Sequence, residues 1–357
     1  MHMTRRMVIL VALGVCASLA AAVNGQVVIT SAGATFPMPL YQTMIAQFMQ
    51  KHPNVKINYG GGGSGQGIKG ITDKTLAFAG SDAPMRSDEL KAAGGADAII
   101  EFPTCAGAVV PAYNVPGVQG DLNFSGDVLG NIYLGKINNW NDPEIAAVNP
   151  GVTLPNLPMV PAWRSDSSGT NFVWTSYLSK KNKVFSARIG AGKQVHFLVG
   201  QGGIQNAGVA AIVQTTPGAI GYIEQNYAEL NHIQFGLVQN NKGKFIKAST
   251  DAVTLAAASA ANDLKGNVLH ASIWDEDGDG VYPISSLTYL IAYKDLSNLR
   301  SREEAQAVVD FFWFVTHGGQ GDAVKLYYAP LGDQVQKKVE AALGQFIYKN
   351  QAIQPQP

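Results

Sequence analysis

The sequence has few cysteines, no excess of either charge and, after its N-terminal segment, no long apolar run. Only two cysteines occur in 357 residues, and one lies in the N-terminal segment, so an internal disulfide in the processed chain is excluded. Basic and acidic residues number 26 each, and removal of residues 1–25 leaves 24 basic against 26 acidic residues. Because nucleic acid needs a broad basic surface, this balance argues against such a partner. No run beyond residue 25 could span a bilayer, and we expect a globular protein.

Several catalytic and cofactor signatures are also absent. The glycine run Gly60–Gly67, expected to be a loop, lacks the Gly-Lys-Ser/Thr ending of a nucleotide-binding P-loop. Asp275, Asp277 and Asp279 have the spacing of the first ligands in an EF-hand calcium loop. The twelfth position of that loop is normally glutamate, but here it is Ser286. The histidines have no metal-ligand spacing, and no Gly-x-Ser-x-Gly elbow occurs. We therefore expect no metal, no cofactor and no enzymatic activity.

The first 25 residues have the pattern of a secretory signal peptide. Arg5 and Arg6 precede an apolar stretch that is too short for a typical membrane span, and small residues follow it. Cleavage after Ala22 fits this pattern as well as cleavage after Gly25. We assign residues 1–25 to a signal peptide and expect the mature protein to be secreted.

Neither cysteine is expected to carry chemistry. Cys16 follows Val15, which is bulky where a lipid-attachment site needs a small residue, so lipidation is disfavoured. Cys105 lies between apolar segments, and a packed, inert thiol is a better interpretation of it than a nucleophile.

Three predicted strands in the first 85 residues end in polar turns. The strands are Val27–Thr30, Val55–Tyr59 and Leu76–Gly80. The turns after them carry Thr35, Ser64 and Asp82, and in α/β sheets ligands bind at the carboxyl ends of strands. Taken alone, each residue also has an ordinary interpretation, as a helix cap, a residue of a flexible loop and a turn residue respectively.

The segment Arg164–Thr170 places one cation, several hydroxyls and a glycine directly before a predicted helix. A helix start offers unpaired N–H groups and a partial positive charge, which together suit a tetrahedral oxyanion. In isolation, a surface ion pair followed by an ordinary helix start is the better interpretation of the segment.

The remaining chain continues the alternation of strands and helices, which indicates two α/β lobes. An apolar strand is expected over Ile99–Asn114, with the crossing between lobes near Pro111. A return strand is expected over Val281–Tyr293. Helices are expected over 252–264, over 305–315 and over 335–346, and the last two can return to the first lobe.

Six segments resemble one family in their order and spacing. The ligand loops and scaffold segments that carry the resemblance are Gly33–Pro37, Ser81–Pro84, Arg164–Thr170, Tyr133–Ile137, Pro217–Tyr222 and Tyr282–Ser285. They resemble the periplasmic phosphate-binding protein of the bacterial high-affinity phosphate ABC transporter, and the resemblance covers most of the mature chain.

The resemblance implies an α/β fold of two lobes, that of a type II periplasmic binding protein, with two crossover strands between them. Together with the predicted crossing, it divides the chain into residues 26–111 and 284–357 for lobe I and residues 112–283 for lobe II. We expect a periplasmic monomer whose partners are inorganic phosphate and the inner-membrane permease subunits.

The resemblance also implies the phosphate-binding residues. Carried over one by one, they are Thr35, Phe36 through its backbone N–H, Ser64, Asp82, Arg164, Ser168, Gly169 through its backbone N–H, and Thr170. Asp166, by analogy, orients Arg164. Three positions depart from the family pattern, since Ala77 replaces an acidic residue, Gly65 a serine and Ser167 a glycine.

Asp82 is the residue that predicts specificity. An ionised carboxylate only accepts hydrogen bonds, so it accepts the proton of hydrogen phosphate and repels sulfate, which has none. Together with the resemblance, this predicts a non-enzymatic protein that captures phosphate and, as the resemblance implies, delivers it to an ABC permease. Two alternatives stay open, a phosphomonoester hydrolase on this fold and a binding protein for sulfate, molybdate or tungstate.

Overall fold

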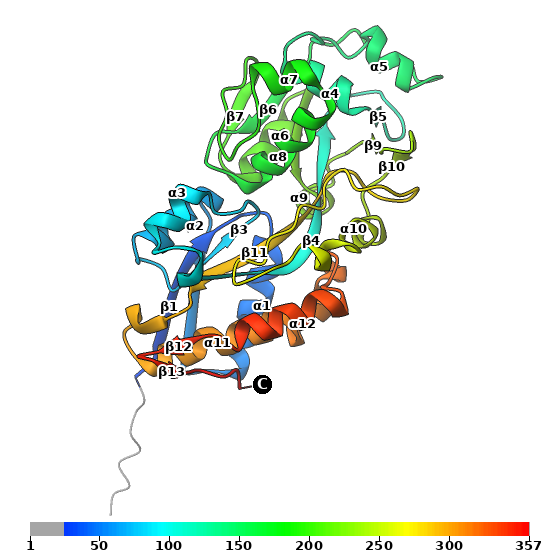
Figure 1. The fold of residues 1–357 in the computed structure, drawn as a ribbon. Coiled ribbons are helices and arrows are strands. Elements are labelled where there is room, and N and C mark those ends of the chain that lie inside the picture. Colours follow the sequence, from blue (N-terminus) through cyan, green and yellow to red (C-terminus); the bar gives the residue numbers. More distant parts are fainter. Residues whose placement is uncertain (1–24, 357) are drawn as a thin grey trace, which may run out of the picture.

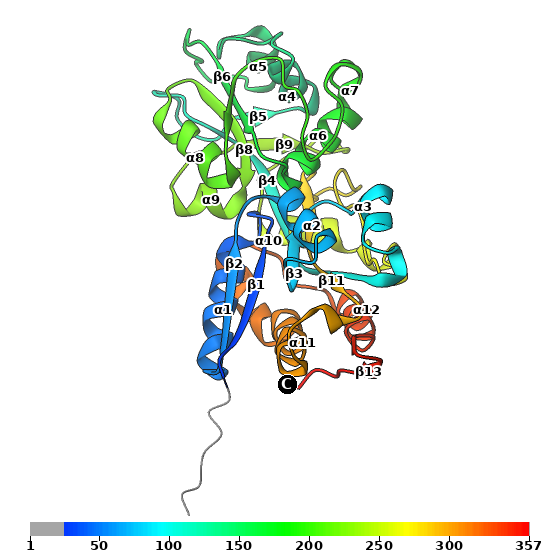
Figure 2. The same ribbon diagram turned by 90° about the vertical axis from the view of Figure 1, so that its left-hand side faces the viewer.

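The computed structural model describes residues 25–356 as two α/β lobes stacked on one another (Figures 1 and 2). The predicted signal peptide, apart from Gly25, and Cys16 lie outside the described residues. In residues 25–356 there is no helix of the length and hydropathy that crossing a membrane requires. The two-lobed α/β prediction is confirmed.

Eight strands form one mixed sheet that runs through both lobes. In order across the sheet they are β2 (Val55–Gly60), β1 (Val27–Gly33), β3 (Phe78–Ser81), β11 (Ser285–Tyr293), β4 (Ile99–Tyr113), β8 (Ala219–Glu224), β6 (Val160–Arg164) and β7 (Gln201–Gly203). The strands β2, β1 and β3 pair in parallel, as do β8, β6 and β7. Each lobe therefore gathers the carboxyl ends of three strands, and the turns that follow them, along one edge.

The strand β4 joins the lobes, and Figure 1 shows it running from the lower lobe into the upper one. Its residues up to Ala108 pair antiparallel with β11, whereas those from Val109 onward pair antiparallel with β8. The segment that leads into β11 runs beside this switch, since Val109 donates its N–H to the Ile284 carbonyl at 2.9 Å and Tyr282 Oη donates to the Val109 carbonyl at 2.9 Å. The predicted boundary at residue 111 falls within β4.

The helices of the first lobe come from both ends of the chain. They are α1 (Met38–Lys51), α2 (Ser64–Thr72), α3 (Ser87–Ala92), α11 (Arg302–Thr316) and α12 (Asp333–Leu343). In α1 a stripe that includes Tyr41, Met44 and Phe48 is buried, and α11 packs against α1 and β1. Figure 2 shows α11 and α12 in the same lobe as α1, which confirms that the C-terminal helices return to the first lobe.

The second lobe holds shorter elements around a core of large aromatic side chains. Its helices are α4 (Gly126–Tyr133), α5 (Pro143–Val148), α6 (Gly169–Lys181), α7 (Lys183–Arg188), α8 (Gln205–Thr215) and α9 (Gln225–Leu230). Tyr222 packs in this core against both Tyr133 and Trp174, with ring centroids 5.9 and 5.0 Å away. This packing holds α6, which begins at a predicted site segment, against the sheet.

The remaining elements are small. A three-stranded sheet of the second lobe contains β5 (Asn123–Phe124), β9 (Leu237–Gln239) and β10 (Phe245–Ile246), and a hairpin near the C-terminus contains β12 (Ile347–Tyr348) and β13 (Gln351–Ala352). The helix α10 (Thr250–Ala257) packs against β4 and β11.

Two local predictions were wrong. The run Gly60–Gly67 is not a loop throughout, because α2 begins at Ser64. A Cβ at Gly67 would lie 2.9 Å from Gly33 Cα, so glycine there permits close packing of helix on strand. The return strand begins at Ser285 rather than Val281, because the segment before it contains Pro283, which has no N–H for a ladder.

Candidate anion-binding site

Three turns of the first lobe meet at the carboxyl ends of β1, β2 and β3. Ala34 donates its N–H to the Gly80 carbonyl at 2.8 Å, and Gly63 donates to the Gly33 carbonyl at 3.0 Å. The Asp82 N–H donates to Ser64 Oγ at 3.1 Å. These bonds tie the three turns to one another, so the predicted residues Thr35, Ser64 and Asp82 are fixed at one edge of the sheet.

Asp82 is a buried carboxylate whose two oxygens differ. Its Oδ1 accepts a hydrogen bond of 2.8 Å from Thr288 Oγ1, whereas its Oδ2 is buried without a hydrogen-bond partner among residues 25–356. Burial raises the pKa of Asp82 from 3.8 to about 7, against the opposing effects of Thr288 and Arg164. In the ionised form, Oδ2 is an acceptor available for a ligand that brings its own proton.

The second lobe contributes the end of β6 and the start of α6. The Arg164 guanidinium forms a fork with the Asp166 carboxylate, Nε to Oδ1 at 2.8 Å and Nη2 to Oδ2 at 2.5 Å. Its remaining nitrogen, Nη1, donates to Thr170 Oγ1 at 3.3 Å. Although burial raises the pKa of Asp166, hydrogen bonds from Arg164 outweigh that effect and hold it below its usual value. The fork fixes the position of the Arg164 guanidinium relative to Asp166.

The start of α6 is capped by a predicted site residue. Ser168 Oγ accepts a hydrogen bond of 3.1 Å from the Asn171 N–H, and the Ser168 N–H donates to the Lys193 carbonyl at 2.7 Å. The Gly169 and Thr170 amides lie in the first turn of the helix. Helices leave such amides without an internal acceptor, and they carry the positive end of the helix dipole.

The two lobes bring these halves into contact. A Cβ at Gly169 would lie 2.5 Å from Asp82 Oδ2, so the start of α6 abuts the orphaned carboxylate oxygen. Gly65 donates its N–H to the Ser167 carbonyl across the lobes at 2.9 Å. Lys193 Nζ also crosses, lying 2.8 Å from both Glu89 carboxylate oxygens. The structure therefore describes a closed arrangement.

All eight predicted binding residues are buried at this junction of the lobes. Phe36 lies beside Thr35, and its carbonyl accepts a 2.7 Å hydrogen bond from Tyr328 Oη. Thr35 and Phe36 lie in the turn between β1 and α1, which begins at Met38. Pro37 keeps Phe36 out of the helix, because a residue before proline is disfavoured in the α conformation.

Gly65 and Ser167 are two of the three positions that depart from the family pattern, and they face each other across the lobes. A Cβ at Gly65 would overlap the Ser167 side chain, so a serine at position 65 would not fit beside Ser167. The first lobe therefore has glycine at position 65 in place of the family's serine, and the second lobe has Ser167 in place of the family's glycine, so the Ser167 side chain occupies the space that a serine at position 65 would need. Neither departure removes a predicted binding residue.

Sequence reasoning missed Asn206 and Thr288. Asn206 follows β7, and its Nδ2 donates to Thr35 Oγ1 at 3.0 Å and to Thr170 Oγ1 at 3.2 Å. The rule that ligand sites follow strand ends could have drawn attention to Asn206, because Gly203 ends a short strand. Thr288 lies inside the buried strand β11, and its sequence context carries no comparable signal.

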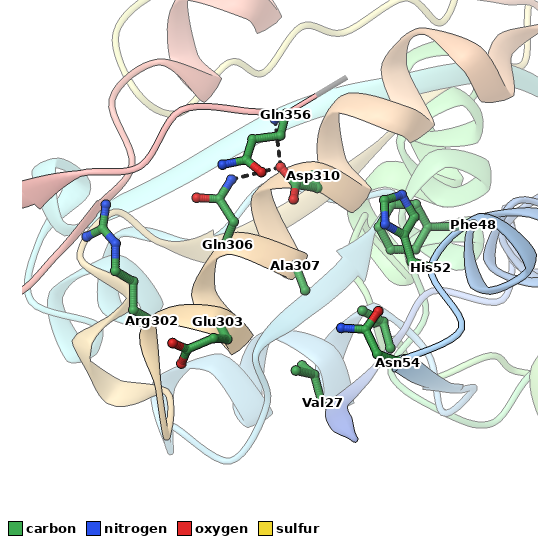
Figure 3. Close-up of a pocket in the computed structure, with 11 residues that line it drawn as sticks. Val27, Phe48, His52, Asn54, Arg302, Glu303, Gln306, Ala307, Asp310 and Gln356 are labelled. Carbon is green, nitrogen blue, oxygen red and sulfur yellow. Dashed lines mark hydrogen bonds between the residues drawn. The ribbon is translucent and has the colours of Figure 1, made fainter. Parts of the chain in front are cut away.

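The described residues show no cluster that could hold a metal ion. In residues 25–356 no group of three or more His, Cys, Asp or Glu side chains could hold a metal ion. Asp275 of the calcium-like segment instead contacts Lys180 Nζ at 3.0 Å and Lys181 Nζ at 2.5 Å. The cavity in Figure 3, of about 360 Å³, lies between α1 and α11 and contains none of the predicted residues.

Comparisons with known proteins identify the family of this chain. A model of the PBP superfamily domain matches residues 20–313. The phosphate-binding protein PstS of Pasteurella multocida is 37% identical over 314 residues, which cover 88% of this chain and 89% of that protein. The PstS of Methanocaldococcus jannaschii is 36% identical over 332 residues, covering 87% and 84% of the two chains.

Solved structures share the fold. A high-affinity periplasmic phosphate-binding protein (PfluDING) bound with phosphate has a TM-score of 0.69 at 21% identity, covering 88% of this chain and 93% of its own. A putative phosphate ABC transporter substrate-binding protein from Clostridium perfringens, with bound phosphate, has a TM-score of 0.62 at 18% identity, covering 85% and 100%. The resemblance noted in the sequence motifs is thereby confirmed. The chain belongs to the PBP superfamily and, within it, to the PstS family of phosphate-binding proteins.

Proposed function

We propose that this protein captures hydrogen phosphate between its lobes and delivers it to a membrane-embedded ABC permease. The observation that carries the proposal is the convergence of Arg164 and the orphaned Asp82 Oδ2 in one buried site. A fixed cation and helix-terminal amides suit an oxyanion, whereas a free carboxylate oxygen suits only an oxyanion that carries a proton.

The two serine hydroxyls of the site are free to donate their hydrogens to an anion. Ser64 Oγ accepts from the Asp82 N–H, and Ser168 Oγ accepts from the Asn171 N–H, so each hydroxyl hydrogen can be donated to a ligand. With the Phe36 and Gly169 amides, these donors would surround one tetrahedral ion. Each hydrogen bond to a charged acceptor contributes about 1.5–3 kcal/mol.

Ligand binding would favour closure because the two halves of the site belong to different lobes. The first-lobe half alone offers Thr35, Phe36 and Ser64, and closure adds Arg164 and the start of α6. Shifting a two-state equilibrium from 1:99 to 99:1 needs about 5.5 kcal/mol of differential binding. Three charge-assisted hydrogen bonds from the second lobe supply that amount, so closure can report occupancy to a permease.

The proposals that the protein is secreted and takes part in transport are supported by its family membership. The curated relatives are phosphate-binding proteins, and one solved structure of this fold is that of a putative phosphate ABC transporter substrate-binding protein. A periplasmic location, reached through the signal peptide of residues 1–25, would place this protein beside an inner-membrane permease. We propose that it acts there as a monomer.

Catalysis is not part of the proposal. A phosphomonoester hydrolase needs an activated nucleophile or a metal-bound water. Burial raises the pKa of the Cys105 thiol, which removes it as a nucleophile. A chromogenic phosphate ester incubated with the protein should therefore release no chromophore, and sustained release would contradict the assignment.

Small-angle X-ray scattering tests the proposed mechanism. Phosphate should reduce the radius of gyration of the protein as the lobes close, whereas sulfate at the same concentration should leave it unchanged. Scattering curves that are identical with and without phosphate would count against ligand-driven closure.

A further inference from the structure

Asn206 contacts both threonines of the site without being one of the predicted phosphate-binding residues. It lies at the start of α8 and is fully buried. The Glu224 N–H donates to its Oδ1 at 3.0 Å, which fixes the amide so that Nδ2 faces the threonines. From there Nδ2 donates to Thr35 of the first lobe at 3.0 Å and to Thr170 of the second lobe at 3.2 Å.

A count of hydrogen bonds at the two hydroxyls shows what these contacts do. A threonine hydroxyl has one hydrogen to donate and two lone pairs to accept. Thr35 Oγ1 accepts from Asn206 Nδ2 and, at 3.3 Å, from the Asn206 N–H. Thr170 Oγ1 accepts from Asn206 Nδ2 and, at 3.3 Å, from Arg164 Nη1. Both lone pairs of each oxygen are therefore occupied.

The only hydrogen-bonding capacity left to either hydroxyl is its own hydrogen. We infer that Asn206 is a positioning residue that fixes both threonine hydroxyls as donors to the bound anion, and this inference rests on the proposed function. A hydroxyl that could also turn a lone pair toward the site would repel an anion in part of its orientations. Asn206 removes those orientations before the ligand arrives, at no cost in ligand contacts.

Replacement of Asn206 by aspartate distinguishes the orienting of the threonine hydroxyls from a role in packing alone. In Asn206→Asp a carboxylate of nearly the same shape would accept hydrogen bonds from the threonines, turn their hydrogens away and add a negative charge. Asn206→Ala would merely release the hydroxyls. We expect Asn206→Ala to weaken phosphate binding about tenfold, the loss of roughly one net hydrogen bond. Asn206→Asp should weaken it at least tenfold further at pH 8, an effect on the scale of a reversed charged hydrogen bond.

The pH dependence and a matched control complete the experiment. Phosphate affinity is measured by titration calorimetry from pH 8 to pH 5. The gap between Asn206→Asp and Asn206→Ala should shrink as the new carboxylate is protonated, because the acid form can donate again. Asn182→Asp is the control, since aspartate keeps the cap in which Asn182 Oδ1 accepts from the Phe185 N–H. The bonds it loses, from Nδ2 to the Asp127 carbonyl and to Asn131, involve none of the predicted binding residues, so this variant should bind phosphate like the wild type.

A double-mutant cycle provides a second measurement should Asn206→Asp fold poorly. In a Thr35→Val/Thr170→Val background there is no hydroxyl to orient, so Asn206→Ala should change the affinity less than twofold, compared with about tenfold in the wild-type background. Additive effects in the cycle, or equal losses in Asn206→Asp and Asn206→Ala at every pH, would overturn the inference. A wild-type chain that does not bind phosphate would instead overturn the proposed function itself.

Discussion

Thr288 Oγ1 donates a 2.8 Å hydrogen bond to Asp82 Oδ1 from a strand 206 positions further along the chain. This bond occupies one carboxylate oxygen and leaves Oδ2, which faces Gly169, without a protein partner in the described part of the chain. The carboxylate is thus held in place through Oδ1, while Oδ2 stays available to accept a hydrogen bond from a ligand. Specificity for a protonated oxyanion depends on that second oxygen.

Removal of the Asp82 carboxylate should weaken discrimination between phosphate and sulfate. Asp82→Ala eliminates the acceptor for the phosphate proton and also the charge that repels sulfate, so the ratio of the two affinities should fall by about two orders of magnitude or more. Competition titrations measure this ratio. Asp310→Ala, at a carboxylate of the cavity in Figure 3, is the control and should leave the ratio unchanged. An unchanged ratio in Asp82→Ala would refute this account of specificity.

The raised pKa of Asp82 predicts a pH dependence of stability in the ligand-free protein. Between its unfolded value of 3.8 and its folded value of about 7, Asp82 binds more protons in the folded state than in the unfolded state. Its contribution to stability is therefore fully present below pH 4 and is lost as the pH rises toward 7, with a slope of up to about 1.4 kcal/mol per pH unit. Denaturant unfolding of the wild type and Asp82→Asn measures the difference, which should fall with rising pH. A difference that is constant from pH 4 to pH 7 would contradict this prediction.

The contact between lobes at Gly169 predicts a variant that folds but does not close. In Gly169→Ala the new Cβ would lie 2.5 Å from Asp82 Oδ2 and 2.7 Å from Asp82 Cβ, and both atoms belong to the other lobe. Phosphate affinity should fall by roughly a hundredfold, because the lost second-lobe hydrogen bonds are worth several kcal/mol. The melting temperature without ligand should change little.

A suitable control for that variant is Gly344→Ala, since nothing lies closer than 3.6 Å to its Cβ position. It should bind phosphate normally. Undiminished affinity in Gly169→Ala would show that the arrangement described here is not the one that holds the ligand.

The facing pair of Gly65 and Ser167 predicts compensation between two substitutions. Gly65→Ser places a side chain where the Ser167 side chain already lies, so closure and phosphate affinity should suffer. Adding Ser167→Gly vacates that space, and the double variant should recover the wild-type affinity to within about threefold, as expected for residues in direct contact that couple strongly. Calorimetry on the single variants and the double variant measures the coupling, and purely additive losses would argue against it.

The site could be predicted from the sequence where the chemistry is local. The segment Arg164–Thr170 contains its own ion pair and helix cap, and these contacts span only a few residues. Asp82 stood out because it follows a short strand. Thr288 could not be identified in this way, because it lies inside a buried strand and contacts Asp82 from 206 positions away. Asn206 does follow a strand end, but its contact with Thr35 spans 171 positions and has no local signal.

The fold could also be predicted where the sequence pattern is local. The prediction failed where tertiary contacts decide the structure. Alternating and 3.6-residue patterns located β1, α1, β4 and α11, whose buried faces follow the apolar residues. The loop predicted over Gly60–Gly67 was wrong from Ser64 onward, because glycine normally disfavours a helix, whereas here Gly67 is needed for close packing of α2 on β1. Such a packing requirement is a tertiary contact, and it leaves no trace in local periodicity.

The most direct test is isothermal titration calorimetry of the mature, phosphate-stripped protein with phosphate and with sulfate at pH 8. The arrangement of Arg164, Ser168 and Thr170 opposite Asp82 predicts saturable binding of one phosphate per chain and sulfate binding weaker by at least two orders of magnitude. Equal affinity for the two ions, or no heat with phosphate, would contradict the account.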